Sequence, residues 1–297
     1  MVQKRTVGKT VFDIINYLLL AFIAIACILP MWHVLMASFS EPGKLLAAKG
    51  TILWPLGKAT LEGYRIVFKD KNIATGYGNT LIYVACFTGI GVVGTLIAGF
   101  VLSRTYFMFK NVIVFIITFT MMFNGGMVPT FIVIRNLGMY DTRWAIILPG
   151  AISVFNVVIM RTSIQGIPDS LEESAKLDGA GNMTILFKIF VPLIKATIAV
   201  IILFMAVGMW NSWFQAMLYL RSQELRPLQL VLREILIRND TSNMMKNVGM
   251  ANRQEIDQYE RLVQYTTTIV ATAPILCIYP FVQRFFVTGV MIGSLKG

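Results

Sequence analysis

Six apolar runs, separated by polar segments, dominate the pattern of this chain. Most are close to the roughly 20 residues that a helix needs to cross about 30 Å of hydrocarbon. A bilayer offers no water to the backbone, so each run must satisfy its own hydrogen bonds and be helical. The pattern predicts an all-α membrane protein with six transmembrane helices, at residues 14–39, 81–102, 112–134, 144–160, 189–209 and 265–282.

The polar segments set the predicted sidedness. Lys4, Arg5 and Lys9 precede the first run, which favours a cytoplasmic N-terminus, and six crossings return the C-terminus to the same side. More lysines and arginines lie in the predicted outer segments than in the inner ones, mostly in two long outer loops where the charge rule is weak. The expected parts are an N-terminal tail at 1–12, a six-helix domain at 13–288 with outer loops at 40–79 and 216–261 and a cytoplasmic loop at 166–193, and a C-terminal tail at 289–297.

Composition excludes a soluble globular protein, because the mean hydropathy is +0.69 with 56% hydrophobic and only 14% charged residues. The net charge of +11 is spread over loops on both faces, so lipid head groups are the expected partner and nucleic acid is not. Cys27, Cys86 and Cys277 all lie in apolar runs and offer neither a disulfide framework nor a metal site. His33 has no carboxylate at helical spacing, so an interfacial histidine is favoured over a proton relay.

Two glycine patterns look like nucleotide-binding motifs and are interpreted otherwise. The run from Gly89 to Gly94 matches a dinucleotide fingerprint but lies within an apolar span with no strand before it. Gly91 and Gly99, with Thr95 between them at four-residue spacing, instead form a small face that a neighbouring helix can approach closely. The other pattern, at residues 8–10, lacks the first glycine of a phosphate-binding loop. We expect this chain to bind no cofactor, and no catalytic or metal set is found.

The cytoplasmic segment 166–193, called the coupling loop below, is predicted to hold two short helices with a bend. Ser170 and Glu173 have the spacing of a capping box and follow Pro168, so a helix should begin there. Gly179 can take positive φ and end it. Asp178 or Asn182 can then cap a second helix that continues into Pro192. A polar helix attached at both ends to membrane spans would transmit force from whatever binds it, although an ordinary capped helix in a loop stays an alternative.

This loop carries a family resemblance. Glu173-Ser174-Ala175, then Leu177-Asp178-Gly179-Ala180, then Pro192, resemble the EAA loop of ABC-importer permeases, with Ser174 where the family more often has alanine and Ala196 where it often has proline. The resemblance implies the ABC-importer permease fold, in which the first short helix is a coupling helix that sits in a groove of a cytoplasmic ATPase. The residues that it assigns to coupling are Ser170, Glu172, Glu173, Ala175, Asp178, Gly179 and Ala180.

A second cluster interleaves aromatic and amide side chains at the end of the fifth run. Trp and Tyr gather at membrane interfaces in any protein, but flat apolar faces beside amides and hydroxyls are also what a carbohydrate binds. In the third run, Asn124-Gly125-Gly126 and Pro129 predict a broken helix, which is either a cavity wall or a packing kink. The predicted substrate path consists of Asn124, Trp210, Asn211, Trp213, Gln215 and Tyr219.

The resemblance extends along the whole chain. Asn79-Thr80, the segment 210–213, Pro227-Leu228-Gln229 and the tail 289–297 are similar to the carbohydrate-uptake branch, which includes the smaller permease of the maltose importer and the permeases for complex or acidic oligosaccharides. It implies a multi-pass subunit of the bacterial cytoplasmic membrane. The implied partners are a second homologous permease, two cytoplasmic ABC ATPases that hold the ATP and Mg, and an extracytoplasmic solute-binding protein that delivers an oligosaccharide.

Three other functions are considered. An ABC permease for a different solute, such as an amino acid or an inorganic anion, is opposed only by the aromatic and amide cluster. An ion-coupled secondary carrier typically has charged residues deep in its spans, and these runs are almost free of them. A non-transporting scaffold would not need a bent, capped helix pair in the cytoplasm.

Overall fold

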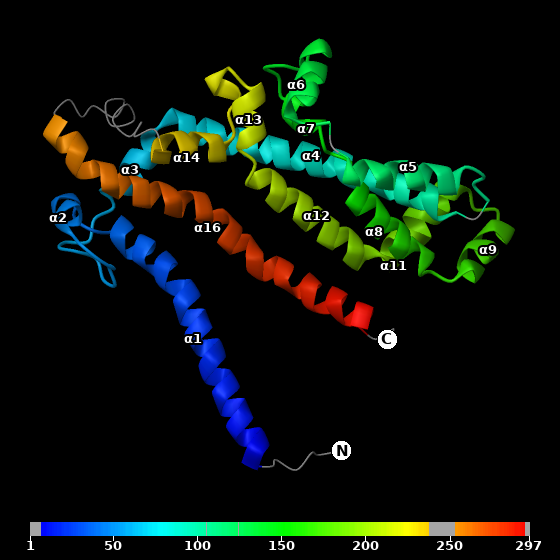
Figure 1. The fold of residues 1–297 in the computed structure, drawn as a ribbon, viewed down its shortest axis with the longest axis horizontal. Coiled ribbons are helices and arrows are strands. Elements are labelled where there is room, and N and C mark those ends of the chain that lie inside the picture. The colour runs from blue at the N-terminus through cyan, green and yellow to red at the C-terminus, as the bar shows by residue number, and fades with distance from the viewer. Residues whose placement is uncertain (1–6, 105, 124, 238–252, 295–297) are drawn as a thin grey trace. The chain divides into compact units, whose positions relative to one another are not determined.

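The computed structural model describes residues 7–104, 106–123, 125–237 and 253–294, and every regular element in them is helical. The elements (Figure 1) are α1 Val7–Ser38, α2 Pro42–Ala47, α3 Glu62–Lys69, α4 Lys71–Ser103, α5 Lys110–Met122, α6 Met127–Asn136, α7 Trp144–Ile147, α8 Val154–Gln165, α9 Asp169–Leu177, α10 Asn182–Thr184, η1 Ile185–Phe190, α11 Val191–Leu193, α12 Lys195–Trp210, α13 Phe214–Tyr219, η2 Gln223–Leu225, α14 Leu228–Ile237 and α16 Arg253–Ser294.

The chain forms two compact units, and the first contains residues 1–71 and 234–273. In it, α1 is apolar and exposed along most of its length, as expected of a helix whose solvent is lipid. Its C-terminal end packs with Leu45, Ile52 and Leu262. His33 accepts a hydrogen bond from the Ile52 N–H at 2.8 Å and meets the Tyr265 ring edge-on at 5.5 Å. His33 Nε2 also lies 3.4 Å from the Tyr265 hydroxyl, and the preference for an interfacial histidine over a proton relay stays a prediction.

The second unit contains residues 72–233 and 274–297 and holds both candidate sites. Within it, glycines on α4 allow the close approach that their spacing predicts. A Cβ on Gly99 would lie 2.7 Å from Met160 of α8, and a Cβ on Gly91 would lie 2.0 Å from Met205 of α12. The interpretation of this pattern as helix packing is therefore confirmed.

The predicted spans are only partly continuous helices. α1 and α4 are each long and apolar enough to cross a membrane, whereas α5 with α6 and α10–α11 with α12 are helix pairs bent by 116° and 84°. The fourth run is not one helix, because α7 ends at Ile147 and α8 begins only at Val154. The prediction of one continuous helix at 144–160 was wrong, and the count of six spans stays a prediction.

Proline and glycine account for the break in the fourth run. Pro149 lacks the N–H that a continuing helix would use, and Gly150 takes a φ of +78°, which ends right-handed helix geometry. Broken backbone at membrane depth is tolerated where it lines a cavity or packs on protein. The segment between α7 and α8 is therefore expected to line a cavity or to pack on protein.

Replacing Gly99 by valine is expected to destabilise the second unit by about 1–3 kcal/mol, because the added side chain overpacks the contact between α4 and α8. Gly89 lies on the same helix, and a Cβ on it would have no atom within 4 Å, so Gly89→Val is the matched control. Thermal unfolding of the purified protein in detergent measures both. Equal midpoints for the two variants would contradict close packing at Gly99.

Candidate coupling helix and transport cavity

The coupling loop begins with α9, but not as its sequence predicts. Pro168 is the N-cap, and no side chain caps the helix. Ser170 is the second helical residue, so its hydroxyl is inside the first turn and cannot act as the cap of a capping box. The predicted helix exists, but its N-cap lies two residues earlier than the capping box predicts, and the predicted capping box was wrong.

The end of α9 follows the prediction for Gly179. This residue has a φ of +80°, its N–H donates to the Lys176 carbonyl at 3.0 Å, and the next N–H, of Ala180, reaches back to the Ala175 carbonyl at 2.9 Å. This is a Schellman motif, which satisfies the last carbonyls of the helix and turns the chain. Asp178 is the exposed C-cap residue and makes no cap for the next helix.

The second helical stretch runs through α10, η1 and α11 before the chain bends at Ile194. Its N-cap is Gly181, so the expectation that Asp178 or Asn182 would cap it was wrong. η1 is a π-helical turn in which the Val191 N–H donates to the carbonyl five residues back. The wider turn precedes Pro192, whose ring and missing N–H disturb regular α-helical bonding.

α9 has two distinct faces. Its two buried residues are Glu172 and Ala175, and Ala175 joins a hydrophobic cluster with residues of α4, α8 and η1. The opposite side exposes four residues at spacings of three and four, which share one helix face. That exposed stripe consists of Ser170, Glu173, Ser174 and Leu177, and Leu177 is 90% exposed.

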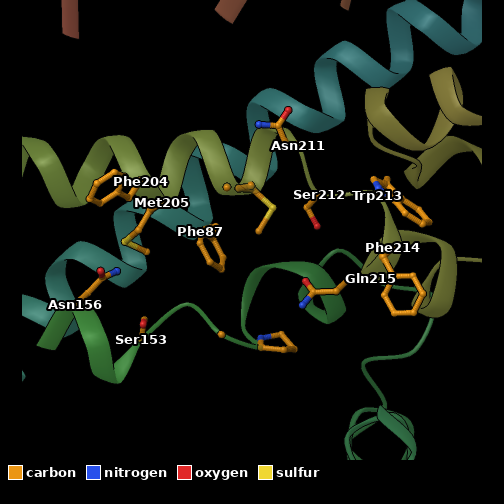
Figure 2. Close-up of a pocket in the computed structure, with 14 residues that line it drawn as sticks. Phe87, Ser153, Asn156, Phe204, Met205, Asn211, Ser212, Trp213, Phe214 and Gln215 are labelled. Carbon is orange, nitrogen blue, oxygen red and sulfur yellow. The ribbon is translucent and has the colours of Figure 1, made fainter. Parts of the chain in front are cut away.

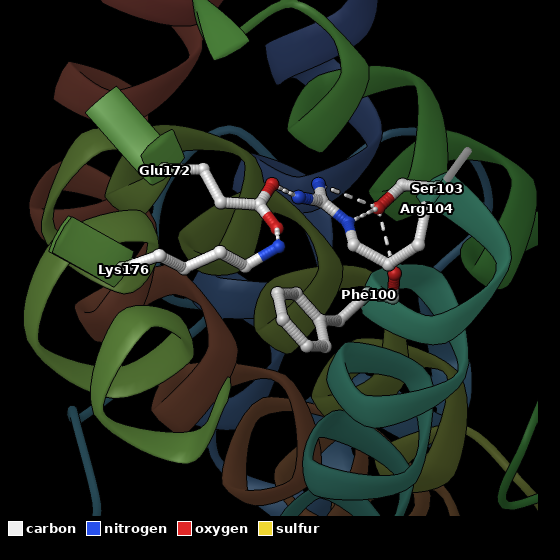
Figure 3. Close-up of polar contacts among 5 residues, drawn as sticks. All are labelled: Phe100, Ser103, Arg104, Glu172 and Lys176. Carbon is white, nitrogen blue, oxygen red and sulfur yellow. Dashed lines mark hydrogen bonds and ion pairs between the residues drawn. The ribbon is translucent and has the colours of Figure 1, made fainter. Parts of the chain in front are cut away.

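The buried carboxylate of Glu172 is shared by two cations (Figure 3). One oxygen is ion-paired with the guanidinium of Arg104, which directly follows α4, and the other lies 2.7 Å from Lys176 Nζ, one turn along α9. Arg104 also donates from Nε and Nη2 to Ser103 Oγ, at 3.0 and 2.9 Å. Removing one member of a buried ion pair costs about 3–5 kcal/mol, because the other charge is left unpaired.

Two aromatic rings complete the surroundings of Arg104. Its guanidinium carbon lies 4.9 Å from the Phe100 ring centroid and 5.0 Å from that of Phe190. Phe100 belongs to α4 and Phe190 to η1, so the guanidinium contacts two helical segments and reaches α9 through Glu172. Burial lowers the pKa of Arg104 from its ordinary value, but guanidinium groups stay charged in proteins.

A cavity of about 560 Å³ lies between α4, α8, α12 and the segment after α12 (Figure 2). Two interruptions of the helices line it, one between α7 and α8 and one between α12 and α13. Among the described residues that line it, the polar ones are all neutral. The aromatic and polar members are Phe87, Ser153, Asn156, Phe204, Asn211, Ser212, Trp213, Phe214 and Gln215.

The structure divides the predicted substrate path. Asn211, Trp213 and Gln215 line the cavity. Trp210 is only 7% exposed, is not among the lining residues, and meets the Tyr77 ring at 6.2 Å. Tyr219 is buried beside Phe131 at 6.1 Å and does not line the cavity either. Asn124 lies outside the described residues.

Of the aromatic and polar residues that line this cavity, the predicted substrate path did not include Phe87, Ser153, Asn156, Phe204, Ser212 and Phe214. Phe87 looks like any core residue of α4. Ser153 and Asn156 lie at the start of α8, directly after the break at Pro149 and Gly150. That break was the sequence signal that could have pointed to them.

The segment between α13 and α14 is fastened to α4 by side chains. Asn79 Nδ2 donates to the carbonyls of Glu224 and Arg226 at 2.6 and 3.1 Å, and Thr80 Oγ1 accepts from the Leu228 N–H at 2.9 Å. Two motifs that resemble the carbohydrate branch, Asn79-Thr80 and Pro227-Leu228, are thus in contact with each other.

Asp141 fastens the same segment from the loop between α6 and α7. Its carboxylate accepts from the Ser222 N–H and hydroxyl, at 2.9 and 2.7 Å, and from the Arg221 N–H at 2.8 Å. These bonds, those from Ser222 foremost, lower the pKa of Asp141. Its φ of 57° is one that aspartate tolerates better than most residues.

Comparison with known proteins establishes the family to which this chain belongs. The chain belongs to the family described as binding-protein-dependent transport system inner membrane component, whose model matches residues 90–292. It is 38% identical to the polygalacturonan/rhamnogalacturonan transport system permease protein YtcP of Bacillus subtilis (strain 168), over 96% of this chain and 98% of the relative. It is 35% identical to Protein LplC of the same organism, over 99% and 97% of the two chains.

Solved structures agree with this assignment. A chain of a bacterial ABC transporter involved in the import of the acidic polysaccharide alginate matches with a TM-score of 0.85 at 29% identity, over 95% of this chain and 99% of that one. A chain of the bacterial alginate transporter in complex with alginate pentasaccharide-bound periplasmic protein matches at 16% identity and shows the fold alone. The resemblance to carbohydrate permeases of ABC importers is thereby confirmed.

The two tryptophans after α12 are expected to differ in their effect on stability. Trp210→Ala should cost about 3–5 kcal/mol, because it empties a buried site. Trp213→Ala should cost much less, since its ring is partly exposed and lines a cavity that already exists. Thermal unfolding in detergent compares the two purified variants. A larger loss for Trp213→Ala would contradict the assignment of Trp213 to the cavity and of Trp210 to the core.

Proposed function

We propose that this chain is the membrane-spanning permease subunit of an ATP-driven importer, and that it translocates an oligosaccharide delivered by an extracytoplasmic solute-binding protein. Family membership and the carbohydrate permeases among its relatives support the proposal. In the proposed assembly the chain pairs with a second homologous permease and with two cytoplasmic ATPases, which hold the ATP and Mg. Both termini lie in the cytoplasm, and the chain itself catalyses no reaction.

The observation that carries the proposal is the lining of the cavity. Its aromatic faces, such as those of Phe87 and Trp213, can pack on the C–H faces of sugar rings. Its neutral amides and hydroxyls, such as those of Asn156, Asn211 and Ser212, can exchange hydrogen bonds with sugar hydroxyls. Interrupted helices that face a shared cavity are the arrangement by which transporters expose backbone to a solute.

The exposed stripe of α9 supports the coupling part of the proposal. Ser170, Glu173, Ser174 and Leu177 present one continuous exposed face, which leaves the outer side of α9 accessible to a partner. The inward-facing Glu172 and Ala175 connect that face to α4 and η1. We therefore assign contact with the ATPase to the exposed stripe and transmission of its movement to the buried pair. Gly179 and Ala180 fix the bend that follows.

The alternative solutes are less compatible with this lining. An inorganic anion or a small amino acid offers no sugar-ring C–H face on which the aromatic side chains of the cavity could pack. An ion-coupled carrier is also disfavoured by membership of a binding-protein-dependent family.

A deletion strain of the source organism tests the proposal. The probes are labelled oligogalacturonide, alginate oligosaccharide and arabino-oligosaccharide, with a labelled amino acid as the solute control. Loss of the gene should abolish uptake of at least one oligosaccharide and leave amino-acid uptake unchanged. Restoring the wild-type chain should return that uptake, whereas Trp213→Ala should return about a tenth or less of it, the loss expected when roughly 1.4 kcal/mol of transport-site interaction is removed.

The control is Val112→Ala, at an exposed residue of α5 that belongs neither to the cavity lining nor to the coupling loop, which should restore full uptake. Immunoblots confirm that each variant reaches the membrane. Unchanged uptake of all three oligosaccharides in the deletion strain, or loss of only the amino acid, would overturn the proposed function.

A further inference from the structure

Three helical segments of the second unit meet at Arg104. Its backbone directly follows α4, and its guanidinium carbon lies 4.9 Å from the ring centroid of Phe100 of α4 and 5.0 Å from that of Phe190 of η1. Its charge is matched by Glu172 of α9 (Figure 3). The contact is at the C-terminal end of α4, where the helix dipole favours a cation. Arg104 and Glu172 are called the α4–α9 joint below.

The joint is the directional part of the attachment of α9. Only Glu172 and Ala175 of this helix are buried. Ala175 contributes a methyl group to an apolar cluster, and such contacts do not fix orientation because they are non-directional. The ion pair is directional, because Ser103 and two rings orient the guanidinium and the guanidinium orients the carboxylate.

We propose that the α4–α9 joint makes α9 and the cytoplasmic end of α4 move as one body, with Arg104 and Glu172 as positioning residues for the transmission of force. The inference rests on the proposed function, in which an ATPase binds the exposed stripe of α9. The joint holds that stripe outward and carries its displacement into α4, whose glycine face contacts α8 and α12. Those contacts lie beside the cavity.

Distances between spin labels test whether α9 and α4 move as one body, in the purified complex of the chain with its partner permease and ATPases. The three cysteines are first replaced by alanine, and labels are then placed at Leu177 on α9 and Val101 on α4, which are both exposed. A second pair joins Leu177 to Ser222 in the segment before α14. Distances are recorded without nucleotide and after trapping with ATP and vanadate. The wild-type distance from Leu177 to Val101 should be narrow and equal in the two states, while the distance from Leu177 to Ser222 should change.

Two variants separate positioning from stability. Glu172→Gln leaves the charge of Arg104 unpaired. In this variant the distribution of distances between the labels at Leu177 and Val101 should widen about twofold. The double variant Arg104→Met with Glu172→Leu replaces the pair by apolar residues, which commonly keep or raise stability. It should melt at or above the wild-type temperature and still give the widened distribution. Lys176→Ala removes the more exposed cation and its contact with the Tyr106 ring but keeps the ion pair of the α4–α9 joint, so it is the matched control and should give the wild-type width.

A wild-type distance from Leu177 to Val101 that changes on trapping would overturn the inference. So would a wild-type distribution in the apolar double variant, since the pair would then contribute stability alone. Failure of the proposed function gives a different result, in which no ATPase copurifies and vanadate with ATP leaves the 177–222 distance unchanged.

Discussion

The buried ion pair between Arg104 and Glu172 is the interaction on which the coupling region depends. Neither charge is stable in that position alone, because desolvation is costly unless an opposite charge and hydrogen bonds compensate it. Their pairing favours the rotation of α9 about its axis that turns Glu172 and Ala175 inward. That rotation decides which residues of the coupling loop face inward and which form the exposed stripe.

A second constraint, the need of backbone polar groups for partners, determines the structure around the cavity. Backbone polar groups in a membrane need partners, so helices are interrupted only where protein or a cavity receives the freed groups. Here the interruptions before α8 and after α12 line the same cavity. Neutral amide and hydroxyl side chains accompany them, which gives this part of an apolar unit a surface suited to sugar hydroxyls. Asn79 and Asp141 meanwhile hold the neighbouring segment in place through backbone carbonyl and N–H groups.

Features of this fold that follow from the properties of a single residue could be predicted from the sequence. The positive φ of Gly179 and the close contact at Gly99 follow from the absence of a Cβ. Features that depend on distant residues could not be predicted. The resemblance placed Glu172 among the coupling residues but gave it no partner, and its partner Arg104 lies in another polar segment. Trp210 and Trp213 are equivalent by composition, and only the turn between α12 and α13 directs one to the core and the other to the cavity.

Photo-crosslinking from α9 tests the central claim most directly. A photoreactive amino acid is placed at Ser174 or Leu177 of the exposed stripe, or at Ser222 as a control in the segment before α14, and cells containing the whole importer are irradiated. Products are identified by mass spectrometry. The account predicts that both α9 positions crosslink to one ABC ATPase and that Ser222 does not. Crosslinks from α9 only to lipid, to a protein outside the cytoplasm, or to nothing would contradict it.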